Sequence, residues 1–126
     1  MFKKRLKRIL LLIQCLTRAI FYGRADKISP NPSRIIVVPS GKLGDVVCNT
    51  PVLFAIRTHL PNVHIIVAGN SKLHRQLLAD SGLVDEYLDL EEKEVLTSIK
   101  KCHADVAIVT GPSFESTSLF YLAGRC

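Results

Sequence analysis

The segment Gly41-Lys42-Leu43-Gly44-Asp45 combines residue types that ligand-binding loops use. Glycines permit tight turns and let a ligand approach the backbone closely. A lysine can pair with an anionic group, and an aspartate can accept a proton from a hydroxyl. A helix that follows such a loop adds unpaired backbone N–H groups at its start. The segment is therefore a candidate for ligand binding and for acid–base chemistry.

Two interpretations of Asp45 remain open at this level. As a helix N-cap, its side chain would stabilise the following helix by about 1 kcal/mol. As a general base exposed at the mouth of a sheet, it would take a proton from a bound substrate. The pair Thr50-Pro51 is itself a helix-start signal, because proline is favoured in the first turn. If the main helix begins there, Asp45 caps only a preceding turn and its carboxylate is available for chemistry.

From residue 34 onward, short apolar runs alternate with amphipathic stretches, which predicts strands and helices in turn. Strands are expected at 34–38, 63–68, 84–90 and 105–110, and helices at 45–59, 71–81, 91–101 and 114–123. Gly82 and Gly124 fall where helices should end. Strands joined by helices form parallel sheets, so the predicted fold class is α/β with a Rossmann-like parallel sheet. Such sheets bind ligands at the carboxyl ends of their strands, where residues 39–45 follow the first strand.

Several classes of function are disfavoured. The loop lacks the G-x-G-x-x-G spacing of dinucleotide sites and the G-x-x-x-x-G-K-S/T pattern of nucleotide triphosphatases. The first 24 residues hold seven of the 17 basic residues and no acid, so the rest carries ten basic against 11 acidic residues. A nucleic-acid partner is therefore not expected for the folded part.

The cysteines give no sign of a metal site. Four of them occur without C-x-x-C spacing or a histidine at zinc-ligand intervals: Cys15, Cys48, Cys102 and Cys126. Free thiols in a reducing cytoplasm are the simplest interpretation. We therefore expect neither a metal nor a cofactor.

Residues 2–22 form the pattern of a basic amphipathic helix. Its apolar positions are spaced as one face: Phe2, Leu6, Ile9, Leu10, Ile13, Leu16 and Ile20. Such a helix can lie on an anionic membrane surface. Two alternatives stay open, namely a signal peptide with its apolar run at 9–16 and a helix packed against protein. A spanning helix needs about 20 mostly apolar residues, and Gln14 and Arg18 interrupt this one.

The predicted organisation has two parts. Residues 1–33 comprise the amphipathic helix and a linker, in which Ser29-Pro30-Asn31-Pro32-Ser33 is rich in turn formers. Residues 34–126 comprise the Rossmann-like domain.

The loop and the helix after it resemble the glycosyltransferase family 9 enzymes, the lipopolysaccharide heptosyltransferases. The resemblance lies in a strand followed by G-x-[LI]-G-D and x-[VL]-x-x-T-P-x-[LI], which here is Gly41 through Leu53. It continues through Ala55-Ile56-Arg57, Leu60-Pro61-Asn62, residues 63–68, Val84-Asp85-Glu86-Tyr87 and residues 104–108. It covers residues 34–126 and implies the amino-terminal half of a GT-B glycosyltransferase.

The resemblance also implies a reaction and a site. The reaction is inverting transfer of a heptose from an ADP-sugar to the core of lipid A. Asp45 corresponds to the catalytic base, while Gly41, Lys42 and Gly44 would contact the acceptor. The enzyme would work in the cytoplasm, peripherally on the inner face of the bacterial inner membrane, with residues 2–22 on the anionic lipid surface.

The chain departs from that family in two respects. Family members carry a second domain that holds most of the nucleotide-sugar site, and this chain ends at Cys126. We therefore expect the chain alone to be an inactive amino-terminal portion. Many members also lack the basic amino-terminal helix. The alternative is a non-catalytic α/β module that binds a membrane glycolipid or a partner protein.

Overall fold

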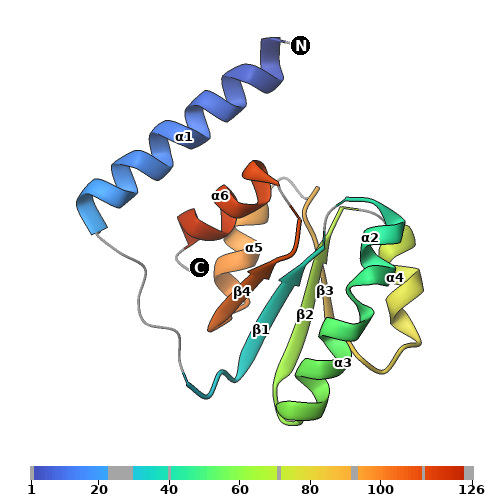
Figure 1. The fold of residues 1–126 in the computed structure, drawn as a ribbon. Coiled ribbons are helices and arrows are strands. Elements are labelled where there is room, and N and C mark those ends of the chain that lie inside the picture. Colours follow the sequence, from blue (N-terminus) through green and yellow to red (C-terminus); the bar gives the residue numbers. More distant parts are fainter. Residues whose placement is uncertain are drawn as a thin grey trace.

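The computed structural model describes residues 2–22, 30–39, 41–70, 72–91, 94–111 and 113–123. Within these ranges the chain forms a sheet of four parallel strands in the order β3-β2-β1-β4 (Figure 1). The strands are β1 (Arg34–Val38), β2 (His64–Gly69), β3 (Glu86–Asp89) and β4 (Val106–Val109). The predicted parallel sheet is confirmed, and β1 lies inside it between β2 and β4.

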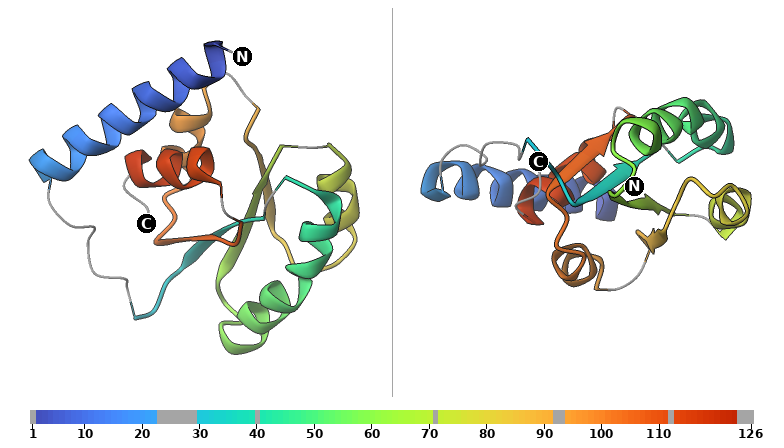
Figure 2. Two further views of the ribbon diagram at one scale, coloured as in Figure 1. Left: turned by 45° about the horizontal axis from the view of Figure 1, so that its top comes forward. Right: turned by 90° about the horizontal axis from the view of Figure 1, so that it is seen from below.

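Helices cover both faces of the sheet (Figure 2). On one face lie α2 (Leu43–Cys48), α3 (Thr50–His59) and α4 (Lys72–Ala79). On the other lie α5 (Val95–Lys101) and α6 (Phe114–Ala123). The range of α6 is the one predicted, whereas β3, β4, α4 and α5 are shorter than predicted and β2 is shifted by one residue. Gly124 lies outside the described residues, and Gly82 adopts a φ of +66° in the turn after α4.

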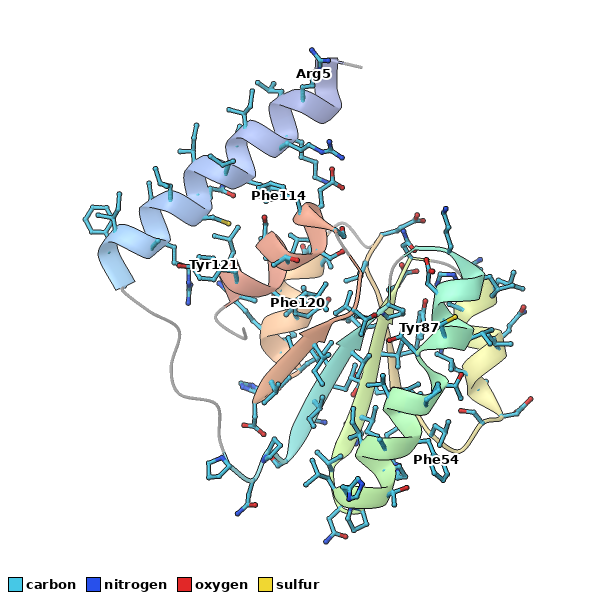
Figure 3. The ribbon with its side chains drawn as sticks, in the orientation of Figure 1. Arg5, Phe54, Tyr87, Phe114, Phe120 and Tyr121 are labelled. Atoms are coloured by element: carbon cyan, nitrogen blue, oxygen red, sulfur yellow. The ribbon has the colours of Figure 1, made fainter. Side chains whose placement is uncertain are left out.

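The sheet separates two apolar cores. In β1, Ile35 and Val37 face α2, α3 and α4, whereas Ile36 and Val38 face α5 and α6. Strand geometry causes this split, because successive side chains point to opposite faces. Phe120 of α6 is fully buried against the second of these faces (Figure 3). A strand buried on both faces needs a continuous apolar run, which is the pattern that β1 carries.

The single helix predicted over residues 45–59 is wrong, because α2 and α3 are separate helices that meet at Asn49. Pro51 has no N–H to donate to the Val47 carbonyl, the acceptor four residues earlier. The Thr50 hydroxyl donates to that carbonyl instead, at 2.7 Å. Asn49 is almost fully buried, and its side-chain amide donates to the Asp45 carbonyl at 2.6 Å. The break is therefore built into the sequence.

Two carboxylates tie the strands together at the amino edge of the sheet. Asp85 Oδ2 accepts from the Ile65 backbone N–H at 2.7 Å and from the Arg57 guanidinium at 2.7 Å. Arg57 also donates to the Val63 carbonyl at 3.0 Å. Asp105 Oδ2 accepts from the backbone N–H groups of Ser33 and Arg34, at 2.7 and 3.0 Å. The backbone N–H groups at the starts of β1 and β2 are thus hydrogen-bonded to carboxylates of neighbouring segments.

The helix predicted at residues 2–22 is confirmed as α1 (Phe2–Tyr22), which packs against α6. Among the described residues, no helix combines the length and the apolar character needed to cross a bilayer. Leu11 is buried in the contact between the two helices, and most of the other large apolar side chains of α1 are exposed.

The Asp85 contacts predict a dependence of stability on pH. Burial raises the pKa of Asp85, but the hydrogen bonds from Arg57 and Ile65 and the nearby positive charges outweigh it, so its pKa lies below the ordinary 3.8. Because the unfolded chain then binds the proton first, the stabilisation is present above the ordinary pKa and is lost as the pH falls through the folded value. The free energy of unfolding in urea, followed by circular dichroism between about pH 3 and 7, should fall at the acid end.

Asp85→Asn should lower the free energy of unfolding at neutral pH and flatten its dependence on pH near the acid limb. Asp80→Asn, at an exposed turn after α4, is the matched control and should leave both unchanged. An acid limb of equal steepness in Asp85→Asn and the parent would contradict the assignment.

Candidate functional site at the carboxyl edge of the sheet

A cavity of about 960 Å³ lies over the carboxyl ends of β1, β2 and β3. Pro39 and Gly41 contribute from the loop after β1, and Gly69 and Asn70 from the end of β2. Segments of α5 and α6 form further walls, and Lys7 and Leu11 of α1 close one side. The cavity therefore occupies the edge of the sheet where Rossmann-like folds bind their ligands.

Gly41 and Asn70 meet at this cavity, although they come from different loops. A Cβ atom built on Gly41 would lie 3.4 Å from Asn70 Nδ2 and 3.5 Å from Asn70 Oδ1. The Asn70 amide offers both a donor and an acceptor, which suits hydroxyl groups. Sequence reasoning missed Asn70; the available signal was its position directly after the second strand.

Asp45 is the third residue of α2, since α2 begins at Leu43 with Lys42 at its N-cap position. The interpretation of Asp45 as the N-cap residue is therefore wrong. A carboxylate in the first turn of a helix is still favourable, because it faces the positive end of the helix dipole. The side chain is partly exposed. Asp45 is not among the residues that line the cavity, which Gly41 reaches from the start of the same loop.

Lys42 and Gly44 are both exposed on the surface of this loop and of α2. A Cβ atom built on Gly44 would have no heavy atom within 4 Å. The described protein therefore does not require a glycine at position 44 for packing.

The cavity also carries charges that sequence reasoning did not select. Glu91 follows β3, Glu94 precedes α5, and Glu115 begins α6. Glu115 pairs with Arg8 of α1 through a contact of 3.2 Å. These carboxylates come from separate segments, so no spacing in the sequence marks them as one group. In the part of the chain that the structure describes, no group of three metal-ligating side chains comes together.

Gly69, at the end of β2, is held by close packing. A Cβ atom there would lie 3.2 Å from Tyr87 Cζ and 3.3 Å from His74 Nδ1, with the Tyr87 hydroxyl nearer still. His74 is buried on α4, and Tyr87 lies on β3 (Figure 3). This glycine lets α4 and β3 approach the end of the strand that borders the cavity.

The fold and the place of the cavity define a Rossmann-like α/β domain with an open carboxyl edge. In fold, the chain is similar to the crystal structure of the glycosyl transferase family 9 protein from Veillonella parvula DSM 2008. The TM-score is 0.59, with 22% sequence identity over 80% of this chain. The chain spans 31% of the length of that structure. No protein-family model and no curated protein matches the chain.

A matched pair of Gly→Ala variants should distinguish a glycine that packing requires from one that it does not. Gly69→Ala should lower the free energy of unfolding by about 1–3 kcal/mol, because the new methyl group overpacks against Tyr87. Gly44→Ala should leave stability unchanged or raise it by up to about 1 kcal/mol, because alanine favours helix and the space is open. Urea unfolding followed by circular dichroism measures both. A destabilised Gly44→Ala, or an unaffected Gly69→Ala, would contradict this account.

Proposed function

We propose that this chain is the acceptor-side domain of a glycosyltransferase of the heptosyltransferase type. The observation that carries the proposal is the Gly41–Asp45 loop at the carboxyl end of the central strand, within a fold similar to a glycosyl transferase family 9 structure. The helix start at Thr50-Pro51 matches the same family pattern. The proposed reaction is inverting transfer of a sugar, heptose from an ADP-sugar, to the core of lipid A.

In this proposal Asp45 is the general base. A sugar hydroxyl is a weak nucleophile, and a positioned carboxylate that takes its proton in the transition state contributes about 10²–10⁴-fold in rate. The hydroxyl oxygen forms its bond to the anomeric carbon while the bond from that carbon to the nucleotide diphosphate breaks. Lys42 pairs with an anionic group of the acceptor, and Gly41 and Gly44 leave room for the sugar.

This proposal assigns the acceptor to the described domain and the nucleotide sugar to a donor-side domain. The chain spans 31% of the length of the similar structure. We expect little or no transfer by this chain alone. The test therefore uses a polypeptide or complex that contains this domain together with a donor-binding domain.

A second candidate is a non-catalytic module that binds a membrane glycolipid or a partner protein. The observation that favours it is the absence of Asp45 from the cavity lining, where Gly41 and Asn70 lie. A binding module would use the cavity without needing a base. The two candidates differ in what a change of Asp45 does.

Asp45→Asn separates the two candidates, because asparagine keeps the size of the side chain and cannot accept a proton as a carboxylate does. If Asp45 is the base, the rate constant for transfer should fall by about a hundredfold or more, with donor affinity nearly unchanged. Single-turnover transfer of labelled sugar to a lipid A core acceptor measures it.

Asp80→Asn is the matched control and should transfer at the parent rate. Unfolding curves for both variants exclude loss of fold as the cause. A transfer rate for Asp45→Asn within a few-fold of the parent would remove Asp45 from the mechanism. Acceptor binding to the isolated chain without any transfer in the assembled protein would instead support the binding module.

A further inference from the structure

Helix α1 is turned so that its polar side contacts the protein. Arg18 donates to the Leu122 carbonyl at 3.0 Å and lies 5.8 Å from the centre of the Tyr121 ring. Arg8 pairs with Glu115, and Cys15 contacts the Ser118 carbonyl at 3.9 Å. Together with the buried Leu11, these positions of α1 recur at intervals of three and four, so they form one face of the helix. Part of the basic charge of α1 is thus used to hold it on α6.

The opposite face of α1 is apolar and exposed. Its large side chains are more than half exposed to solvent: Leu6, Ile9, Leu10, Leu12, Ile13, Leu16, Ile20 and Phe21. Leu11, on the α6 side, is only 7% exposed, although it lies two positions from Ile13. Two positions correspond to about 200° around a helix, so the two side chains point in opposite directions. Figure 3 shows side chains of α1 directed away from the rest of the chain.

We propose that this exposed face of α1 docks into the interface of an anionic lipid bilayer. The charge of the helix favours this occupant, because residues 2–22 contain six basic residues and no acidic one. A helix with one apolar face and basic flanks binds by inserting the apolar side while its cations attract anionic head groups. Arg5 is exposed and not engaged with α6, so it is one cation that can meet the head groups. A second copy of the chain would instead bring together two helices that each carry six basic residues.

The surface continues from α1 toward the body of the protein. A groove of about 620 Å³ is lined by Ile9, Leu12 and Ile13 of α1 and by Phe114 of α6. Ser113 and Glu115 border both this groove and the cavity at the carboxyl edge. The groove beside the proposed lipid-facing side therefore adjoins the cavity through these two polar residues.

The docking would determine how far the cavity lies from the bilayer. Lys7 and Leu11 line the cavity from the inner side of the same helix whose outer side meets the bilayer. A helix with its side chains is about 10–12 Å across, so the cavity would lie about one helix diameter from the lipid. That distance suits an acceptor sugar attached to a lipid anchor, a consequence that rests on the proposed function. The docking itself does not depend on transfer.

The experiment uses the absence of tryptophan from the sequence. Leu16→Trp places a single fluorophore on the exposed face of α1, and Phe54→Trp places one on α3, which is remote from α1 (Figure 3). With vesicles of phosphatidylcholine and phosphatidylglycerol, the emission of Leu16→Trp should shift to shorter wavelength and be quenched by brominated acyl chains. The emission of Phe54→Trp should not change. High salt should reverse the shift, because it screens the head-group charge.

Matched substitutions test the two parts of the docking by vesicle co-sedimentation. Phe21→Ser should weaken partition about tenfold, whereas Phe54→Ser, which removes another largely exposed ring remote from α1, should not. Arg5→Gln should weaken binding to anionic vesicles by about fivefold. Arg18→Gln should do so less, because Arg18 is engaged with α6.

Three results would overturn the proposal. The first is an unchanged Leu16→Trp emission at every vesicle concentration. The second is equal binding to pure phosphatidylcholine vesicles with no effect of salt. The third is a Leu16→Trp shift without lipid that rises with protein concentration alongside a dimer mass in sedimentation, which would assign the face to a second copy. None of these readouts requires transfer activity, so they are independent of the role of Asp45.

Discussion

The burial of β1 on both faces is the constraint on which the rest of the structure depends. Its side chains contact helices on either side of the sheet, so no polar group can be placed along its length without a partner. Polar chemistry is therefore confined to the two ends of the strands. At the amino ends, Asp85 and Asp105 accept backbone N–H groups and join neighbouring segments. The carboxyl ends border a cavity and are the place where a ligand can enter.

This division gives different roles to acidic residues that look alike in the sequence. Asp85 lies in one of the segments that resemble glycosyltransferase family 9. Its contacts with Arg57 and Ile65 hold neighbouring segments of the sheet together. Asp45 lies near the other end of the sheet, in the first turn of a helix that ends after six residues. The short helix results from Thr50-Pro51, because Pro51 cannot continue the hydrogen bonding of α2. The same dipeptide thus sets where α2 ends, three residues after Asp45.

The fold followed from the sequence wherever hydrophobic pattern alone decides the structure. The strand at 34–38 and the helix at 114–123 were predicted with their observed bounds, since a buried strand and an apolar helix have continuous signals. The helix start at Thr50-Pro51 was raised as an alternative and is where α3 begins, whereas the single helix predicted over 45–59 missed the break. The break depends on which group satisfies one carbonyl. For the cavity, the sequence predicted the location at the carboxyl ends of the strands but not most of the lining residues. Asn70, Glu94 and Glu115 come from separate segments, and their proximity depends on the register of the strands and the packing of α5 and α6.

Helix α1 shows why a pattern alone does not assign a face. Its sequence gives an apolar side and basic residues, which fits both a membrane helix and a helix packed on its own domain. In the structure, α1 packs on its own domain through Leu11, Arg8 and Arg18, and its apolar side is left outward. A helix that needed only to cover α6 would bury its apolar side, since each large side chain so buried is worth about 1.5–3 kcal/mol. The outward orientation therefore supports the proposed docking of α1, and the basic charge of the helix favours an anionic surface as its partner.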